Sequence, residues 1–362
     1  MKKLVKPLLI GLGAIALAAA ALGLDLASFG GTFRTLNPGF AGSCASVALG
    51  GSSEDIQIDR ERGIAYLSFL DRATLAGGEP GDGTVMLLDL NVAEPTARAA
   101  MNHDPESFRP HGLSLFKRGT TPARLFAISH RPDGSHSVEI AVQDSGGEFF
   151  PQETIRDPAF VRPNAIAAVG PRQFYLANDS GTAGGFARTV EVLFRRGLAT
   201  LIYYDGSEAR IAATGLAFPA GLALSPDNTR LYVGEALAKS LRIYRRDLAT
   251  GALTLDEKVA LDSAPVNLNV DADGVVWIAA HPNLLALFSH LRDPTRLAPT
   301  QVLRFDPRGA RSAPGEADAR LTQVYSNSGE QLSAGSVAAN WRDEFLIGAL
   351  FDRKVLICKP NH

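Results

Sequence analysis

The chain has 362 residues, of which 46% are hydrophobic and 20% charged, so it can bury one large domain or two ordinary ones. Its formal net charge is −2 with both signs scattered, and the absence of a basic run argues against a nucleic acid as partner. The 35 Gly and 21 Pro favour many short strands and turns over long helices.

The N-terminus differs in composition from the rest of the chain. Three lysines precede an uncharged, apolar run over residues 7–24, which Asp25 closes. This order is typical of an export signal, and a run of about 18 residues is long enough for either a cleaved signal or a spanning helix. We expect residues 1–30 to be a signal peptide or, preferably, a retained signal anchor. Residues 31–362 would then lie outside the cytoplasm, in the periplasm or its equivalent, attached to the membrane through the N-terminus.

Beyond this segment the chain shows short apolar or alternating runs that are separated by Gly, Pro, Asp and Asn, with little helical periodicity. Such runs predict β-strands. In chain order they cover residues 63–69, 84–90, 124–129, 173–177, 200–204, 230–234, 240–245, 274–279, 301–305, 344–348 and 354–358.

An internal repeat links several of these strands. Residues 221–233 and 268–278 each contain a strand, a tight turn with Asp beside Asn or Gly, and a second strand with an aromatic residue. Aligning Leu224 with Val270 places the two copies about 46 residues apart, and residues 164–175 form a weaker third copy. This period is typical of propeller blades, so residues 31–362 are predicted to form an all-β, six-bladed β-propeller.

The chain has two cysteines, Cys44 and Cys358, one near each end of the predicted propeller. Pairing is the expectation for an even number in an exported protein, with two buried, unpaired thiols as the alternative. Because a propeller holds only if its first and last blades are joined, we expect a disulfide between these two residues.

Several segments resemble the serum paraoxonase and arylesterase family, which is related to gluconolactonase and strictosidine-synthase-like propellers. Residues 51–58 (GSSEDIQI) resemble the Gly-Ser-Glu-Asp segment of the family, and residues 108–114 (FRPHGLS) resemble its Asn-Pro-His-Gly-Ile-Ser segment. Further matches follow in the same order, and both cysteines stand where the family has its disulfide. The resemblance covers residues 44–358 and implies a propeller with a catalytic calcium in its central tunnel.

The resemblance also implies which residues hold metal. Glu54, Asn164 and Asn267 match ligands of the catalytic calcium, while Asp55 and the backbone carbonyl of Leu113 match a second, structural calcium. These residue types fit calcium, which takes six to eight oxygen ligands.

Three positions depart from the family pattern. Ala220 stands where the family has an Asn ligand, Val266 where it has an Asp ligand, and Ala165 where the structural site has an Asp. The loss of negative charge should weaken calcium binding. Asn269 lies two residues beyond Asn267 on the same strand face and is a candidate substitute.

The resemblance assigns catalytic roles to two histidines. His111 and His130 match the active-site pair of the family, in which a neutral imidazole takes a proton from the attacking water. The alternative for each is an ordinary hydrogen-bonded strand residue. Asp179 is a candidate auxiliary base, otherwise a turn residue, and His281 is expected in the pocket wall. The other histidines are expected at the surface: His103, His136, His290 and His362.

The sequence therefore predicts a calcium-dependent hydrolase of lactones and aryl or carboxylic esters, and it contains no nucleophile elbow, phosphate loop or paired-cysteine zinc motif. Variable loops such as 179–195 and 282–298 are expected to form the pocket walls. In the second loop, Leu284, Leu285, Leu287 and Phe288 suggest an apolar lip and a small apolar substrate. A metal-free propeller like strictosidine synthase would explain the missing ligands. A non-catalytic binding propeller of the cell envelope is a further alternative.

Overall fold

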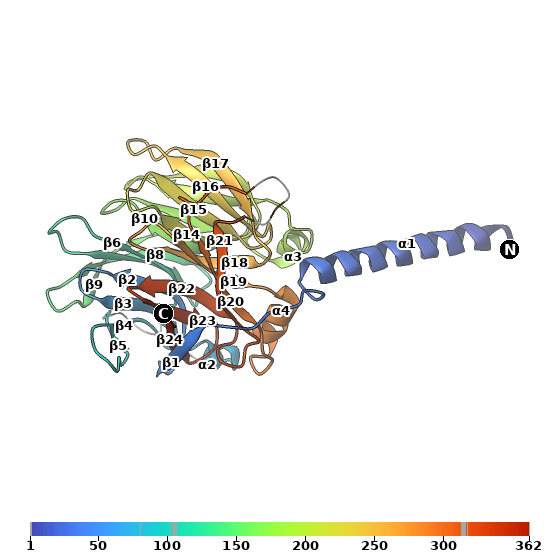
Figure 1. The fold of residues 1–362 in the computed structure, drawn as a ribbon. Coiled ribbons are helices and arrows are strands. Elements are labelled where there is room, and N and C mark those ends of the chain that lie inside the picture. Colours follow the sequence, from blue (N-terminus) through green and yellow to red (C-terminus); the bar gives the residue numbers. More distant parts are fainter. Residues whose placement is uncertain are drawn as a thin grey trace.

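The computed structural model describes residues 2–79, 81–101, 103, 107–312, 316 and 318–361. A long helix, α1 (Lys2–Phe29), projects from a body built of antiparallel sheets (Figure 1). Three short helices lie in loops between strands, and α3 and α4 are at the base of α1. They are α2 (Arg72–Ala76), α3 (Gly185–Leu193) and α4 (Leu284–Arg292).

Four separate sheets contain four strands each, in sequential order. The first is β6 (Pro110–Phe116), β7 (Arg124–His130), β8 (His136–Gln143) and β9 (Phe149–Ile155). The second is β10 (Pro163–Ala168), β11 (Phe174–Asn178), β12 (Ala199–Tyr204) and β13 (Ala209–Leu216). The third is β14 (Pro219–Leu224), β15 (Arg230–Glu235), β16 (Ser240–Arg246) and β17 (Leu253–Ala260). The fourth is β18 (Ala264–Val270), β19 (Val276–His281), β20 (Thr300–Phe305) and β21 (Leu321–Asn327).

The remaining strands form one eight-stranded sheet that brings the two ends of the body together. From the start of the chain it takes β1 (Gly42–Ala48), β2 (Ser52–Asp59), β3 (Ile64–Leu70), β4 (Gly83–Asp89) and β5 (Arg98–Ala99). From the end it takes β22 (Gly335–Trp341), β23 (Glu344–Ala349) and β24 (Lys354–Pro360). The group β2–β5 joins the others through a single residue pair, Ser53 with Ala349.

The first strand of each group faces the centre of the body. Strands β2, β6, β10, β14, β18 and β22 contact one another in turn, and β22 contacts β2 to close the ring. The architecture is therefore all-β and propeller-like, as the repeat predicts. Every predicted strand overlaps an observed one, and the three repeat copies coincide with β10–β11, β14–β15 and β18–β19, the innermost strand pairs of their sheets.

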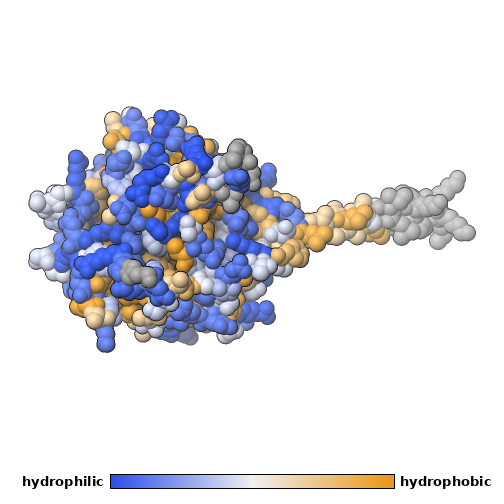
Figure 2. Space-filling model, viewed as in Figure 1, coloured by the Kyte–Doolittle hydropathy of each residue, from blue (hydrophilic) through white to orange (hydrophobic). Residues whose placement is uncertain are grey.

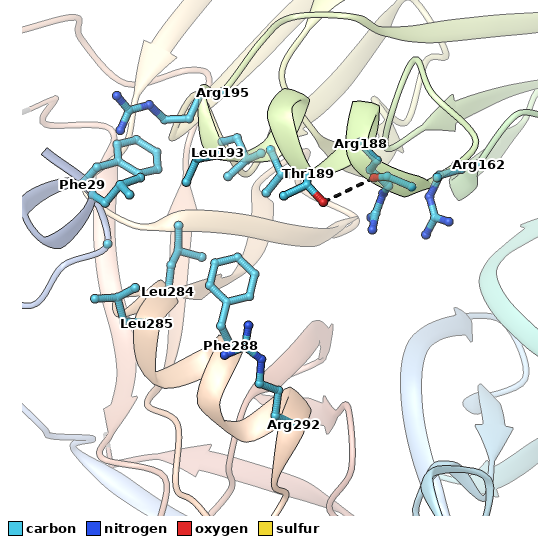
Figure 3. A pocket seen from close by; sticks show the side chains of 16 residues that line it. Phe29, Arg162, Arg188, Thr189, Leu193, Arg195, Leu284, Leu285, Phe288 and Arg292 are labelled. Carbon is cyan, nitrogen blue, oxygen red and sulfur yellow. Dashed lines mark hydrogen bonds between the residues drawn. The ribbon is translucent and has the colours of Figure 1, made fainter. Parts of the chain in front are cut away.

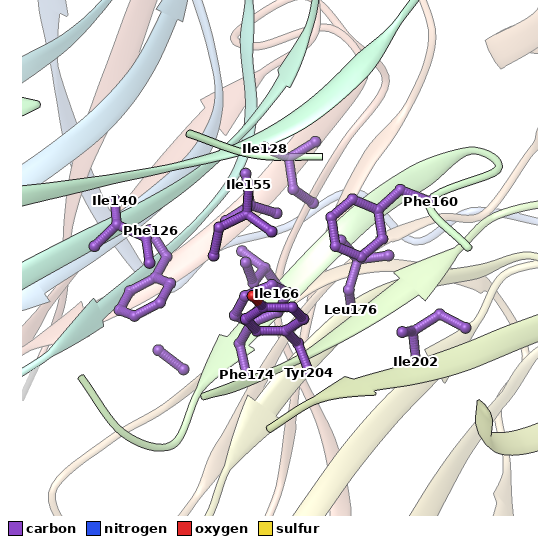
Figure 4. Close-up of a cluster of buried hydrophobic side chains, with 12 residues drawn as sticks. Phe126, Ile128, Ile140, Ile155, Phe160, Ile166, Phe174, Leu176, Ile202 and Tyr204 are labelled. Carbon is purple, nitrogen blue, oxygen red and sulfur yellow. The ribbon is translucent and has the colours of Figure 1, made fainter. Parts of the chain in front are cut away.

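Adjacent sheets are held together by apolar side chains from facing surfaces. Because side chains alternate between the two faces of a strand, Phe126 and Ile128 of β7 point to the same side. There they pack in one buried cluster with Ile166, Phe174 and Leu176 of the next sheet (Figure 4). A fully buried side chain of this size stabilises the fold by about 1.5–3 kcal/mol.

The ring is closed by a strand from the other end of the chain. Strand β1 pairs antiparallel with β24, which places Cys44 opposite Cys358, and a disulfide joins the two residues across a sequence separation of 314. The predicted disulfide is confirmed.

Removing this disulfide should destabilise the protein. A crosslink over so long a loop contributes at most about 5 kcal/mol in the chain-entropy model. We expect the Cys44→Ala, Cys358→Ala double variant to melt several degrees below wild type in thermal unfolding followed by circular dichroism. Reduced wild type is the matched control and should melt with the variant. An unchanged melting temperature would show that the hydrogen bonds between β1 and β24 suffice to close the ring.

Helix α1 contacts the body at its C-terminal end. Within the described residues, Gly11–Phe29 is the one helical segment long and apolar enough to cross a membrane. Its apolar stretch is not buried in the body (Figure 2). At its end, Asp25 forms an ion pair of 2.6 Å with Arg195, while Arg195 and Lys239 lie over the Phe29 ring. The helix ends beside the domain boundary predicted at residue 30.

Candidate functional site

An inner cavity of about 260 Å³ lies where the innermost strands meet. Five of these strands contribute a residue near their N-terminal ends: Glu54 from β2, His111 from β6, Asn164 from β10, Ala220 from β14 and Val266 from β18. These residues are spread over more than half of the chain, and the ring of strands brings them together. Ala220 and Val266, where the family pattern places metal ligands, therefore line the same cavity as Glu54 and Asn164.

Two glycines allow the strands to approach closely at this cavity. A Cβ atom on Gly112 would lie 2.5 Å from the carbonyl oxygen of Asn164, and a Cβ atom on Gly221 would lie 2.1 Å from that of Val266. Any larger residue would push the strands apart. The glycine after His111 is therefore part of how the Pro-His-Gly segment positions its histidine.

Glu54 is a buried carboxyl group with one paired and one unpaired oxygen. Its Oε1 accepts a hydrogen bond of 2.9 Å from Asn267 Nδ2, whereas Oε2 has no hydrogen-bond partner among the described residues. Burial raises the pKa of Glu54 to about 7, against the opposing effects of the Arg72 charge and the Asn267 hydrogen bond. Within the same described part of the chain, the buried Oδ1 of Asn164 also lacks a partner.

These oxygens are the donors that a calcium ion requires. Buried oxygens without a partner are rare in proteins and need a ligand or water to satisfy them. Glu54, Asn164 and Asn267 fit calcium in type, but they offer a single carboxylate. Glu54 and Asn164 line the inner cavity, and Asn267 is hydrogen-bonded to Glu54. In the described residues there is no group of three or more His, Cys, Asp or Glu that could hold a metal ion. Water must therefore supply several ligands if calcium binds here.

The residues expected at a second calcium site make different contacts. Asp55 Oδ1 accepts a hydrogen bond from the backbone N–H of Ile56, and Oδ2 accepts one from that of Leu113, both at 2.7 Å. Burial, followed by the negative charge of Glu54, raises the pKa of Asp55 to about 8. Oδ2 thus ties β2 to β6, whereas the bond to Oδ1 stays within β2. Asp55 and Leu113 are in direct contact, as the resemblance implies, while Ala165 adds no side-chain oxygen, so a second calcium site at these residues stays a prediction.

Asn269, the candidate substitute ligand, does not reach the inner cavity. It lines a separate pocket together with Gln57 and Ser114. Because side chains alternate along β18, Asn269 and Asn267 share one face of the strand. That face runs along the tunnel, so Asn267 lies toward the end with Glu54 and Asn269 toward the other end. Sequence reasoning was wrong on this residue.

Three histidines stand in a row beside the cavity. The ring centroids of His111 and His130 are 4.9 Å apart, and those of His130 and His136 are 4.7 Å apart. His130 Nε2 lies 2.8 Å from the carbonyl oxygen of Pro163, so this nitrogen carries the proton and donates. Burial, reinforced by the charge of Arg72, lowers the pKa of His111 to about 3, and burial also holds the pKa of His130 well below its usual value. Both rings are therefore neutral at pH 7.

The other predicted site residues have mixed outcomes. His281 lines the inner cavity as expected, and burial, followed by the His290 charge, lowers its pKa to about 4. Asp179 is buried and forms ion pairs with Arg162 at 3.0 Å and Arg188 at 3.6 Å. These contacts position the two arginines, and the role of Asp179 as an auxiliary base stays a prediction.

Two of the four histidines expected at the surface are not simple surface residues. His290 is 1% exposed, because α4 turns this side chain inward, where Nδ1 donates a 2.6 Å hydrogen bond to the carbonyl oxygen of Arg296. His136 is half-buried against His130. His103 stacks on Phe108, and His362 lies outside the described residues.

An outer pocket of about 720 Å³ adjoins the inner cavity between the end of α1, α3 and α4 (Figure 3). Leu284 and Phe288 line both spaces, Leu285 lines the outer pocket and Leu287 the inner cavity, which confirms the predicted apolar lip. The sequence did not reveal that the loops over 179–195 and 282–298 contain the helices α3 and α4. It also gave no indication that arginines from several loops meet around this pocket.

Comparison with known proteins agrees with the geometry. The sequence model of the arylesterase family matches residues 49–359. Serum paraoxonase/arylesterase 1 of Rattus norvegicus is 31% identical over 330 residues, which cover 89% of this chain and 90% of the rat protein. The chain belongs to the serum paraoxonase/arylesterase family. The Homo sapiens paraoxonase/arylesterase 1 is 30% identical, with 85% of each chain covered.

Solved structures support the fold alone. A luciferin-regenerating enzyme is 12% identical with a TM-score of 0.54, covering 88% of this chain and 95% of its own. The aldose sugar dehydrogenase of Streptomyces coelicolor is 15% identical with a TM-score of 0.52, covering 89% and 99%. These enzymes carry different names on one architecture, so chemistry must be argued from the cavity of this family member.

The raised pKa of Glu54 makes stability depend on pH in a defined direction. Because its pKa in the folded protein lies above the usual value, its contribution is complete below about pH 4.5 and is lost as the pH rises through 7. In chelator, the free energy of unfolding of wild type should therefore fall relative to that of Glu54→Gln between pH 5 and 8, by on the order of 3 kcal/mol.

Urea unfolding of both proteins across this pH range measures the difference, which also includes the effect of the Glu54 charge on the pKa of Asp55. With millimolar calcium the wild-type trend should reverse, since the metal binds the ionised carboxylate. A difference that does not vary with pH would show that Glu54 ionises at its ordinary pKa.

Proposed function

We propose that the protein is a calcium-dependent hydrolase of lactones and of aryl or carboxylic esters. Family membership supports an esterase- or lactonase-like hydrolase. The observation that carries the proposal further is the inner cavity itself, where two unpartnered oxygens, Glu54 Oε2 and Asn164 Oδ1, share one space with His111. A cavity with apolar walls and a few polar groups at one end is suited to a small ester or lactone.

We also propose that the body is a six-bladed propeller. The eight-stranded sheet joins its halves through only one residue pair, and each half has an innermost strand in the ring, β2 or β22. Counted as two blades, this sheet and the four separate sheets make six, with β1 as the outer strand of the last blade.

In this function His111 acts as the general base. It is neutral at pH 7 and lines the cavity, so it can take a proton from a water molecule that attacks the carbonyl carbon. Its Nε2 lies 3.6 Å from Glu54 Oε1, and an ionised Glu54 favours the imidazolium that results. His130, fixed by its hydrogen bond to Pro163, packs against His111 and limits its ring orientation.

Glu54, Asn164 and Asn267 would hold the calcium ion. When bound, the ion supplies Lewis-acid polarisation of the substrate carbonyl. The chain itself keeps Asn267 in place, because its Nδ2 donates to the backbone and side-chain oxygens of Glu54, each at 2.9 Å, and Glu54 is thereby pinned to the base of the cavity.

Replacing His111 tests its role. His111→Gln should retain bound calcium, because Gln preserves the shape of the site, but should lower kcat for phenyl acetate or a γ- or δ-lactone by about 10²–10⁴. Steady-state kinetics and calcium content per chain are the measurements. His103→Gln is the matched control and should behave as wild type, because the His103 ring stacks on Phe108 and does not line the inner cavity. Wild-type protein that hydrolyses none of these substrates in millimolar calcium would contradict the proposed function.

The missing ligands give a sharper test of the metal. Ala220→Asn together with Val266→Asp restores two oxygen donors and one negative charge in the cavity that Glu54 and Asn164 already line. We expect calcium to bind this double variant at least tenfold more tightly than wild type, about 1.4 kcal/mol or more, in calorimetric titration. Ala220→Asn with Val266→Asn adds the oxygens without the charge and should gain less. Equal affinity in all three proteins would show that calcium binds elsewhere or not at all.

The apolar side chains of Ala220 and Val266 also favour a second candidate, a metal-free propeller of the strictosidine-synthase-like kind. A metal-free enzyme would keep its activity in chelator, and the purified protein would contain no calcium. A binding propeller of the cell envelope would show neither calcium nor turnover.

We further propose that the propeller lies outside the cytoplasm with α1 in the membrane. The disulfide is typical of an oxidising compartment, and Gly11–Phe29 has the length and composition of a span. Fractionation of cells that express the full chain checks this location, and untagged protein in the soluble cytoplasm with reduced Cys44 would contradict it.

A further inference from the structure

The outer pocket has one sign of charge. Arg162, Arg188, Arg195 and Arg292 line it, and no Asp or Glu is among the described residues that form its lining (Figure 3). The rest of the lining is mostly apolar. An apolar pocket ringed by guanidinium groups is complementary to a ligand that has both an apolar chain and a negative charge.

The ion pairs in the structure do not neutralise these arginines. Arg162 and Arg188 share the single carboxylate of Asp179, and Arg195 pairs with Asp25. Arg292 forms no ion pair with any carboxylate in the described part of the chain. One positive charge therefore remains at the shared Asp179, and a second remains at Arg292.

Hydrogen-bond donors at the pocket are also unused. Within the described residues, Arg188 Nε and Arg195 Nη1 are buried nitrogen atoms without a hydrogen-bond partner. A buried donor that lacks an acceptor destabilises the protein until a ligand supplies one, and a charged acceptor forms the strongest bond with a guanidinium. Carboxylate oxygens have this chemistry.

Helical spacing joins this charge to the inner cavity. Arg188 and Val192 are four residues apart on α3 and line both spaces. Leu284, Phe288 and Arg292 follow the same four-residue spacing along α4, which puts two apolar side chains and one arginine on one face of the helix. A ligand with its carbonyl group beside His111 can thus place an apolar chain along α4 and reach arginine at both helices.

We propose that the substrate is an anionic amphiphile: an ester or lactone whose apolar acyl chain carries a carboxylate that Arg188 and Arg292 bind. This inference rests on the proposed hydrolase function and names its substrate class. In the reaction, water gives its oxygen to the acyl carbon, the ester C–O bond breaks, and the proton passes to the leaving oxygen. The carboxylate at the far end of the chain takes no part in this step and serves only for recognition.

A pair of matched substrates tests the proposal. Mono(4-nitrophenyl) adipate carries the carboxylate, and its methyl ester has the same chain without the charge. We expect wild type to hydrolyse the anionic substrate with a kcat/KM at least tenfold higher, mainly through a lower KM, and the ratio should shrink in 0.5 M salt because salt screens the attraction. Arg188→Gln and Arg292→Gln should each reduce the ratio several-fold. Arg118→Gln, on the β6–β7 loop at the other end of the innermost strand from His111, is the control and should keep the wild-type ratio.

Binding without turnover provides a second readout. In chelator, calorimetry should show octanoate binding at least tenfold more tightly than 1-octanol, and Arg292→Gln should remove most of this difference. Equal binding of the two compounds, together with equal kinetics for the two esters, would overturn the substrate class. Failure of wild type to hydrolyse either ester in calcium would instead refute the proposed function, whatever octanoate does.

The arginines could also contact lipid headgroups, and vesicles distinguish this source of negative charge. Full-length wild type and both arginine variants are compared on phosphatidylcholine vesicles with and without phosphatidylglycerol. Variants that lose binding to the anionic vesicles but keep the wild-type preference between the two esters would overturn the proposal. Variants that bind the vesicles as wild type does and lose the preference would support it.

Discussion

A ring of sheets has a defined centre only if its two ends are joined, and in this protein the join is made by β1 and β24. Their antiparallel pairing and the Cys44–Cys358 disulfide hold the first strand of the body against the last. The contact between Glu54 and Asn267 depends on this closure, because Glu54 comes from β2 and Asn267 from β18, on the far side of the chain. Neighbouring sequence cannot place Glu54 against Asn267, whereas the closed ring brings the two residues into contact.

The parts of the fold that follow from local pattern were predictable. Each apolar or alternating run that predicted a strand overlaps a strand in the structure. The repeat centred on a turn coincides with the innermost strand pairs of three sheets. The short helices α3 and α4 were not found, since nine residues give little more than two turns of periodicity within long connecting segments. The inward orientation of His290 depends on how α4 folds back over the body, which no local pattern encodes.

For the site, resemblance located what the family shares and geometry supplied the rest. The resemblance assigned Glu54, Asn164, His111, Ala220 and Val266 to one site, and in the structure all five line the inner cavity. The second calcium site at Asp55 and Leu113 stays a prediction, because the contacts of Asp55 in the structure are to backbone N–H groups. The arginines that line the outer pocket were not predicted as a group. Arg162, Arg188 and Arg292 are far apart in the chain and come together only when α3 and α4 fold over the inner cavity. A scan for basic residues in the two loops beside the predicted mouth would have been the only signal.

Helix α1 does more than leave the body. Leu26, Phe29 and Gly30 form part of the wall of the outer pocket. The N–H of Leu284, the first residue of α4, donates a hydrogen bond of 2.8 Å to the carbonyl oxygen of Gly30. In the membrane-anchored hydrolase proposed above, a protease that cut after this helix would therefore do more than release the propeller. The freed propeller would lack one side of the outer pocket, so tethered and shed forms of the same chain would differ in selectivity.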